Sequence, residues 1–287
     1  MADRVWGSGK VTAQPIERAI SSVGLGPDFE VVGVTNPPVM VLHRHLADGE
    51  VYFLSNRKGR PFSGDVAFRV TGRESESWDA DTGSRHPLSY RIDGSRTIVP
   101  VSLEANGSAL IVFRKKTAST QRMIAAPTET RLAAIDGPWT VTFQADRGAP
   151  ATHDISGPGS WTESKLAGVK YFSGTASYKT TWSWTPSGAG RVILDLGEFH
   201  ELADVLVNGR VVKTVWKPPS RVDVTSELKP GANAVEIRVT NLWVNRLIGD
   251  VQPGAEKVTF TVSAPYDANA PLRPSGLIGP VRVLRQH

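Results

Sequence analysis

The sequence predicts an all-β protein made of two antiparallel β-sandwich domains in series. Most of its ordered-looking segments alternate apolar and polar residues with a period of two, as half-buried strands do. Turns separate these short segments, and the 27 Gly and 20 Pro of the chain fall mostly in such turns. At 287 residues the chain can form two domains, each with its own core. The second sandwich has the strand count of a jelly roll.

The N-terminal residues 1–24 form an extension with one short helix. The segment "QPIERAISSVG" (14–24) has apolar positions at helical spacing, and Gly24 is a suitable stop. All other periodic segments predict strands. In chain order they are "EVYFLSN" (50–56), "DVAFRV" (65–70), "RTIVPVSL" (96–103), "SALIVF" (108–113), "WTVTF" (139–143), "ASYKTTWSW" (176–184), "RVILDL" (191–196), "DVLVNGRVV" (204–212), "AVEIRV" (234–239), "KVTFTV" (257–262) and "VRVL" (281–284).

A change in composition marks the expected domain boundary. The segment "TASTQRMIAAPTETRLAAID" (117–136) is polar, contains Pro and lacks sustained alternation. We therefore expect a first sandwich over 25–117, a linker over 118–136 and a second sandwich over 137–287. The chain has no short internal repeat, which excludes a propeller or a solenoid.

Charge and composition exclude several classes of protein. The net charge is +5, but the basic residues are scattered, with "NRKGR" (56–60) and "RKK" (114–116) as the short clusters. Neither cluster lies beside aromatic residues spaced for base stacking, so we expect no nucleic-acid partner. No segment has the roughly 18 apolar residues of a membrane span. We expect no membrane partner either.

The compartment stays open at this stage. The chain has no cysteine, which excludes disulfides and thiolate chemistry without deciding the location. The first residues, "MADRVWGSGKVTAQPIERAI", lack the charged stretch, apolar core and cleavage site of a signal peptide.

The segment "GEFHELAD" (197–204) is the densest group of titratable residues. Glu198, His200, Glu201 and Asp204 offer an acid, a base and metal ligands. On a strand, however, Glu198 and His200 share one face while Glu201 points to the other. A polar strand face is the favoured interpretation, with catalysis or metal binding as the alternative.

A second polar segment, "SESWDADTGSRHP" (75–87), places Asp79, Asp81 and His86 around Trp78. Calcium prefers oxygen ligands such as these Asp side chains, so a calcium site is one interpretation of the segment. Because the segment lacks the Gly and the terminal Glu of an EF-hand loop, an Asp-rich turn between two strands is favoured. We expect no cofactor.

Three weaker patterns carry no chemistry by themselves. His43 and His45 in "LHRH" (42–45) share a strand face, but the sequence shows no third metal ligand. The segment "GSGK" (7–10) lacks the full phosphate-loop pattern. Ser160 and Ser63 lack the motif of a serine hydrolase.

Two loops combine the residue types of a sugar-binding surface. A sugar offers flat C–H faces and a rim of hydroxyls, so its site needs an aromatic platform beside amide and guanidinium groups. The loops "VWKPPS" (215–220) and "TNLWVNRLIGD" (240–250) follow strands of the same region and are expected to meet at one end of the sandwich. The candidate carbohydrate-binding residues are Trp216, followed by Pro218 and Pro219, and Asn241, Trp243, Asn245 and Arg246.

Structural alternatives compete with that interpretation. Trp243 can instead cap the core with its N–H paired to a carbonyl. The pair Asn208-Gly209 predicts a two-residue type I′ hairpin turn. The remaining aromatic residues of this half look like core or strand-pair residues: Trp139, Trp161, Tyr171 and Tyr178.

These motifs carry a resemblance to known families. The order "GPWTVTF", "SWTESKLAGVKYFSGTASYKTTW", "LDLGEFHELADVLVNGRVVKTVWKPPSRVDVTSELKPGANAVEIRVTNLW" and "SGLIGPVRV" resembles the sugar-binding, galactose-binding-like jelly roll of family 2 glycoside hydrolases. The extended "NLWVNRLIGD" and the "WKPP" loop look most like the C-terminal domain of the α-L-rhamnosidases of glycoside hydrolase family 106. In the first half, "SVGLGPDFE", "LHRHLADGEVYFLSN" and "SALIVFRK" look like the β-sandwich that precedes that jelly roll.

The resemblance implies an accessory region. The family's catalytic (β/α)8 barrel needs about 250 residues, and two sandwiches leave no room for it here. We therefore expect a non-catalytic region that binds carbohydrate, rhamnose-containing glycans above all, or supports a barrel. In the second case Arg246 and Asp250 belong to a polar network. The resembled family also implies a periplasmic or secreted location.

Two other functions stay open. The chain can be a glycoside hydrolase, acting with a separately encoded barrel or through an unrecognised site. It can also be an orphaned fragment without activity.

Overall fold

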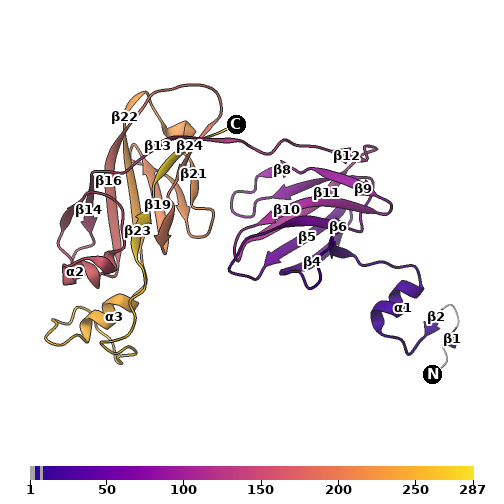
Figure 1. Cartoon of the computed structure of the whole chain (residues 1–287), viewed down its shortest axis with the longest axis horizontal. Helices are drawn as coiled ribbons and strands as arrows, with labels where there is room; N and C mark the ends of the chain where they lie inside the picture. Colours follow the sequence, from indigo (N-terminus) through magenta and orange to yellow (C-terminus); the bar gives the residue numbers. More distant parts are fainter. Residues whose placement is uncertain (1–3, 7–8) are drawn as a thin grey trace. The chain divides into compact units, whose positions relative to one another are not determined.

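The computed structural model describes residues 4–6 and 9–287, with the backbone alone up to residue 10. The chain divides into two compact units, residues 1–126 and 127–287 (Figure 1). Nearly all regular structure is antiparallel β-sheet, which confirms the predicted fold class. In the described part of the chain no helix is long and apolar enough to cross a membrane.

The N-terminal residues form small local elements. Strands β1 (Arg4–Trp6) and β2 (Gly9–Val11) pair with each other, and helix α1 (Ile16–Ser22) follows within the predicted 14–24. No residue of α1 is buried. Gly7 and Ser8 of the "GSGK" segment lie outside the described residues.

The first unit is a sandwich of two five-stranded sheets with strand orders β12-β9-β10-β6-β3 and β4-β5-β11-β7-β8. Its core lies between the sheets, where the ring centres of Tyr52 and Phe68 are 4.7 Å apart and those of Phe68 and Phe113 are 5.3 Å apart. The strands are β3 (Phe29–Val31), β4 (Val39–Leu46), β5 (Gly49–Asn56), β6 (Phe62–Phe68), β7 (Arg73–Trp78), β8 (Arg85–Pro87), β9 (Tyr90–Asp93), β10 (Arg96–Leu103), β11 (Ser108–Lys116) and β12 (Gln121–Arg122).

The second unit packs a six-stranded sheet, β15-β14-β16-β22-β19-β20, against a four-stranded sheet, β13-β24-β17-β21, with the short pair β18-β23 beside them. Its helices are η1 (Trp161–Glu163), α2 (Ala167–Lys170), η2 (Thr225–Glu227) and α3 (Val244–Asp250). Its strands are β13 (Glu129–Ala134), β14 (Trp139–Phe143), β15 (Thr152–Ile155), β16 (Thr175–Trp184), β17 (Arg191–Asp195), β18 (Glu198–His200), β19 (Leu202–Val207), β20 (Arg210–Val215), β21 (Arg221–Asp223), β22 (Gly231–Thr240), β23 (Gly276–Gly279) and β24 (Arg282–Gln286).

Aromatic residues fill the core of the second unit. Trp139, Trp161 and Tyr178 are buried there, as predicted, whereas Tyr171 is half-buried outside the core. The Trp161 indole N–H donates to the Tyr178 hydroxyl, which also accepts from the Leu277 N–H at 3.1 Å. Burial raises the pKa of Tyr178 well above its ordinary value. The polar ends of Trp161 and Tyr178 are thus paired inside the core, whereas the buried Trp139 indole N–H has no hydrogen-bond partner in the described chain.

The hairpin prediction is confirmed. β19 pairs with β20 in antiparallel register, and the two residues between them, Asn208 and Gly209, have φ angles of 52° and 84°. Both values lie in the left-handed region that a type I′ turn requires.

Two segments differ from the sequence prediction. Residues 257–262, "KVTFTV", form no strand, although their alternation is clear. The expected linker 118–136 contains β12, which pairs with β9 of the first unit, and β13, which pairs with β24 of the second. Polar composition therefore marked short edge strands as well as loops.

Candidate functional site

The candidate site lies at one end of the six-stranded sheet, where α3 and the residues after it project beyond β22 (Figure 1). At that end Thr240 of β22 pairs with Thr175 of β16 and with Leu202 of β19. The next row joins Ala203 of β19 to Val215 of β20. The segments after β20 and after β22, which carry the candidate residues, therefore leave the same end of the sheet.

Asn241 joins the end of β22 to the turn before β16. Its side chain is buried, and its Oδ1 accepts from the Gly174 N–H at 2.9 Å. Its Nδ2 donates to the Phe172 carbonyl at 2.9 Å. The Ser173 hydroxyl adds a bond to the Leu242 carbonyl at 2.9 Å. This amide holds two chain segments together and points away from solvent.

Asn245 fixes a second segment from the first turn of α3. Its Nδ2 donates to the Arg273 carbonyl at 2.7 Å, and its Oδ1 accepts from the Arg273 N–H at 2.8 Å. Its Nδ2 also lies 3.2 Å from the Ser275 hydroxyl. The side chain is buried, so α3 is tied to the residues that lead into β23.

Arg246 and Asp250 form a buried ion pair one turn apart on α3, with 2.9 Å between Nε and Oδ1. The guanidinium carbon lies 5.9 Å from the ring centre of Tyr171. Asp250 also accepts from the Val258 N–H at 3.1 Å, the Thr259 N–H at 2.8 Å and the Thr259 hydroxyl. Burial raises the pKa of Asp250, but these hydrogen bonds and Arg246 outweigh it, so the pKa lies below its ordinary value.

The large apolar side chains at this end face solvent. Trp216 is 58% exposed and Trp243 is 68% exposed, so Trp243 does not cap the core. Leu242 is exposed, and Phe260 and Val262 of the segment tied to Asp250 are almost fully exposed. We call this end of the sheet, with residues 240–250 and its five exposed apolar side chains Trp216, Leu242, Trp243, Phe260 and Val262, the α3 end.

The polar candidate residues therefore face inward, whereas a sugar-binding role requires them to face solvent. Asn241, Asn245 and Arg246, expected as sugar ligands, are buried and bonded to neighbouring backbone or to Asp250. Asn241 and Asn245 hold the loops in place, because an unpaired buried backbone group is costly and these two side chains supply partners. Arg246 pairs with Asp250. The two Trp side chains remain exposed, although the Lys217 ammonium lies 4.9 Å from the ring centre of Trp216.

A small hollow of about 10 Å³ lies beside these loops. That is about the space that one water molecule needs and far below the roughly 300–1,000 Å³ of typical small-ligand sites. Two exposed polar side chains border it, Glu201 and Arg273, and neither was a sequence candidate as a sugar ligand. Arg273 lies 28 positions beyond Asn245 and no local motif marks it. The hollow is lined by Glu201, Asn241, Leu242, Val244, Asn245, Arg273, Pro274 and Ser275.

The "GEFHELAD" segment forms local polar contacts. His200 Nε2 lies 3.0 Å from Glu198 Oε1, in agreement with a shared strand face. Glu201 lies between β18 and β19, so strand alternation does not govern it, and its Oε1 is 4.0 Å from His200 Nδ1. Asp204 accepts from the Thr214 hydroxyl of β20 at 2.6 Å. In the described chain, no three such side chains converge to hold a metal.

The acidic segment 75–87 forms a turn between β7 and β8. Asp79 Oδ1 accepts from the N–H groups of Asp81 at 2.9 Å and Thr82 at 2.8 Å, which is the pattern of an Asx turn. The Trp78 indole N–H donates to Glu76, and His86 lies on β8. These two hydrogen bonds of Asp79 stabilise the turn between the strands.

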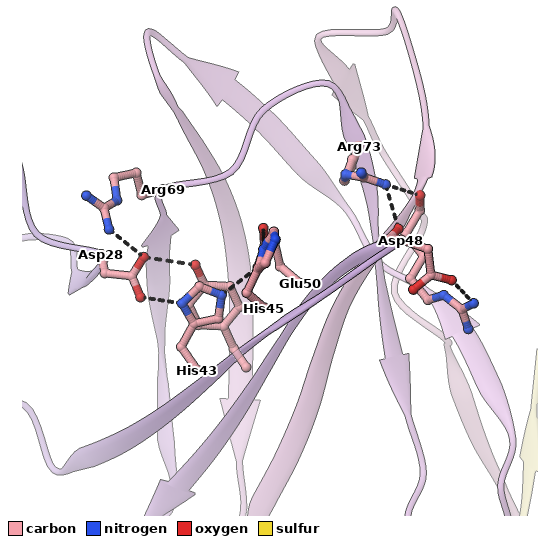
Figure 2. A network of polar contacts seen from close by, with 9 residues as sticks. Asp28, His43, His45, Asp48, Glu50, Arg69 and Arg73 are labelled. Atoms are coloured by element: carbon pink, nitrogen blue, oxygen red, sulfur yellow. Dashed lines mark hydrogen bonds and ion pairs between the residues drawn. The ribbon is translucent and has the colours of Figure 1, made fainter.

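His43 and His45 do have a common partner. His43 lies between Asp28 and Glu50, with Nδ1 2.8 Å from Asp28 and Nε2 2.8 Å from Glu50 (Figure 2). His45 Nδ1 lies 2.7 Å from the other oxygen of Glu50. The Tyr52 ring stacks on His43, and burial together with Asp28 raises the pKa of Tyr52. The group ties β4 and β5 to the segment before β3.

The carboxyl groups with a clear pKa shift all favour the ionised form. The hydrogen bond from Arg122 lowers the pKa of Glu74. Burial raises the pKa of Glu236, but Arg238 and a serine hydroxyl outweigh it and the pKa is lowered. Asp250 behaves in the same way. The general acid of a glycoside hydrolase needs a raised pKa, so none of these three carboxyls fits that role.

Comparison with known proteins finds one matching family and relatives among the glycoside hydrolases. The α-L-rhamnosidase family model matches residues 1–92. The solved rhamnosidase from Novosphingobium sp. PP1Y is 42% identical, with a TM-score of 0.93 over 99% of this chain and 27% of its own. A putative beta-glucuronidase from Formosa agariphila is 35% identical over 51% of this chain and 15% of its own length.

These matches confirm the resemblance to the α-L-rhamnosidases of glycoside hydrolase family 106. They also set its extent, because this chain spans about a quarter of the solved rhamnosidase and less of the curated relative. The relatives are thus glycoside hydrolases several times longer than this chain.

Proposed function

We propose that this chain is a non-catalytic accessory region of an α-L-rhamnosidase-type glycoside hydrolase. Its second unit is then the jelly roll of that enzyme, and the α3 end supports the catalytic barrel. The proposal starts from the rhamnosidase relatives and from the matched share of their chains. It also rests on which side chains at the α3 end are buried and which are exposed.

One observation carries the supporting role: at the α3 end the polar side chains turn inward and the large apolar side chains turn outward. The inward groups are Asn241, Asn245 and Arg246, all buried. The outward groups include Trp243 and Phe260. Burying one such aromatic side chain contributes about 1.5–3 kcal/mol. A cluster of them on a surface is typical of a contact with another protein part.

A non-catalytic role agrees with the architecture. Both described units are antiparallel sandwiches, whereas a catalytic (β/α)8 barrel is an alternation of parallel strands and helices. The carboxyls with shifted pKa values are stabilised as anions by Arg side chains or backbone N–H groups. Such groups maintain structure and do not donate protons near neutral pH.

Carbohydrate contact is the second candidate. Trp216 and Trp243 offer exposed aromatic faces at one end of the sheet, and the hollow beside them has Glu201 and Arg273 at its border. These are the groups that a sugar with a C–H face and several hydroxyls would contact. The rhamnosidase relative makes a rhamnose-containing glycan the first ligand to test.

Two measurements on the purified chain separate the candidates. Turnover is assayed with an aryl α-L-rhamnoside, and binding of rhamnose-containing oligosaccharides is measured by calorimetry. We expect no turnover. Binding that disappears in Trp243→Ala but persists in Val211→Ala, an exposed residue of β20, selects carbohydrate contact. Absence of binding selects support of a barrel.

Turnover that a single carboxylate substitution abolishes would refute the accessory role. It would establish the enzyme alternative, in which an unrecognised site in this chain acts on rhamnosides.

A further inference from the structure

A second apolar surface lies on the first unit, far in sequence from the α3 end. The strand register aligns one row of side chains across all five strands of the sheet β4-β5-β11-β7-β8. Leu42 pairs with Phe53, Phe53 with Leu110, Leu110 with Trp78 and Trp78 with Arg85. Residues in one such row point to the same side of a sheet.

This row lies on the outer side of the sandwich. The residues next to it in sequence, Tyr52 and Ile111, belong to the inner core, so their neighbours face away from that core. On the outer side Leu42 is 54% exposed and Met40 is 53% exposed. Phe53 and Leu46 are also exposed. We call this surface, Met40, Leu42, Leu46, Phe53, Leu110 and Trp78, the outer apolar face.

The opposite sheet of the same sandwich provides a comparison. Its corresponding row runs through Gln121, Arg91, Ile98, Ala67 and Glu30, so it is polar at both ends and apolar in the middle. The two apolar members are buried, Ile98 at 7% and Ala67 at 3% exposed, and Arg91 Nη2 lies 2.8 Å from Asp65 Oδ2 on the same side. The apolar centre of that sheet is thus covered within the first unit. The outer apolar face differs because its Leu42 and Phe53 are exposed.

Strands β5 and β11 therefore carry apolar residues on both faces. Val112 of β11 pairs with Val51 of β5 on the outer side, and Val112 is fully buried although it lies outside the inner core. This pattern is typical of strands that are covered on both sides. The chain itself buries Val112 but the first unit leaves Leu42 and Phe53 exposed, so a cover for these two comes from outside that unit.

Basic side chains lie at the border of the apolar centre, and one half-buried carboxyl, Glu76, pairs with Val112 on the same side. Arg44 and Arg57 are exposed beside it, and Arg57 Nη1 lies 3.0 Å from Met40 Sδ. Arg85 lies 4.3 Å from the ring centre of Trp78. A covering surface with an apolar centre and an acidic rim matches this pattern.

We propose that the outer apolar face is an interface through which the first unit packs against the remainder of a rhamnosidase-type polypeptide. The inference rests on the proposed accessory function and extends it to the first unit. The occupant follows from the size of the relative, because this chain corresponds to 27% of the solved rhamnosidase and the other part has no counterpart in it. A second copy of this chain is the competing occupant.

Two methionine residues provide a built-in probe. Met40 lies on the outer apolar face, and Met123 is 91% exposed outside that face. Peroxide converts an accessible methionine to its sulfoxide, and peptide mass spectrometry measures the rate at each position. In the isolated chain we expect both residues to react at rates within a factor of about five. Sedimentation at increasing concentration is expected to show a monomer.

The same probe is then applied to a hybrid in which this chain replaces the matched region of the Novosphingobium rhamnosidase. We expect Met40 to react at least about tenfold more slowly in the hybrid than in the isolated chain, with Met123 unchanged. A folded hybrid in which Met40 stays reactive would overturn the inference and leave the accessory function intact. Turnover by the isolated chain would instead refute the accessory function.

The isolated chain alone can also overturn the inference. A dimer that protects Met40, and that Leu42→Glu dissociates, would identify a second copy as the occupant. Protection of Met40 relative to Met123 in a monomer would mean that the face is not open.

A paired substitution provides a stability readout. Leu42→Ser with Phe53→Ser is expected to change the Tm of the isolated chain by less than about 2 °C and to lower that of the hybrid by more than about 5 °C. The control, Val34→Ser with Val211→Ser, alters two exposed residues outside the face. Equal shifts of the two pairs in the hybrid would contradict the inference.

Discussion

Asn245 is predicted to be a structural residue whose loss destabilises the second unit. The substitution Asn245→Ala removes the amide that donates to the Arg273 carbonyl at 2.7 Å and accepts from the Arg273 N–H at 2.8 Å. The same substitution leaves the exposed surface of the α3 end unchanged, since Asn245 is buried.

The magnitude follows from the two hydrogen bonds that are lost. Arg273 is an exposed residue, so water replaces the amide as a partner, and each lost bond costs about 0.5–1.5 kcal/mol. We therefore expect a loss of about 1–3 kcal/mol in the free energy of unfolding. Urea unfolding of a unit of this size has a slope of about 2 kcal/mol per molar, so the midpoint of the second unit is expected to fall by about 0.5–1.5 M.

The assay is urea unfolding followed by tryptophan fluorescence, with Trp243→Ala as the matched control. Trp243 lies two positions away and is 68% exposed, so its removal is expected to change stability by less than about 0.5 kcal/mol. The reasoning is refuted if Asn245→Ala is as stable as the wild type, or if Trp243→Ala is the more destabilised of the two.

Three further predictions concern the same unit. The pKa of Asp250 lies below its ordinary value of 3.8, so its ionised form stabilises the fold above that pH, and this contribution is lost as the pH falls through the folded-state pKa. When unfolding is measured as a function of pH, the wild type is expected to lose stability more steeply below about pH 4 than Asp250→Asn. Equal slopes would contradict this prediction. Gly249→Ala is expected to lower the free energy of unfolding by about 1–3 kcal/mol in thermal unfolding, because the new Cβ would lie 2.5 Å from the Tyr171 Cβ. A stabilised variant would show that helix propensity outweighs this clash. Gly209→Val is expected to cost about 1–2 kcal/mol because φ is 84° there, whereas Gly209→Asn costs less, and equal effects would argue against the turn geometry as the cause.

Local sequence signals predicted much of the fold. Strands β10 and β14 have the bounds that the alternation of "RTIVPVSL" and "WTVTF" indicates. The turn at Asn208-Gly209 followed from its two residues, since few others adopt two successive left-handed conformations. The resemblance to rhamnosidases, carried by many spaced motifs, was confirmed by a solved structure over 99% of the chain.

The segment 257–262 shows where a local signal was insufficient. Its alternation of Val, Phe and Val with Lys and Thr is that of a strand, yet no neighbouring strand pairs with it. Asp250 instead binds the backbone at Val258 and Thr259 and holds the segment as a loop with Phe260 exposed. A strand needs a partner edge, and the sequence of one segment does not state whether an edge is available.

For the candidate site, too, local sequence signals predicted some features and not others. The sequence by itself determined the residue types at the end of β22 and the position of that loop in the fold, because alternation and turn residues are local properties. Only the tertiary structure decided which of these side chains face solvent. Asn241 and Asn245 turn inward because backbone groups of Phe172, Gly174 and Arg273, distant in sequence, need hydrogen-bond partners there. Trp243 is 68% exposed and is not among the residues that pack in or against the core of the second unit, a position that depends on contacts between distant segments.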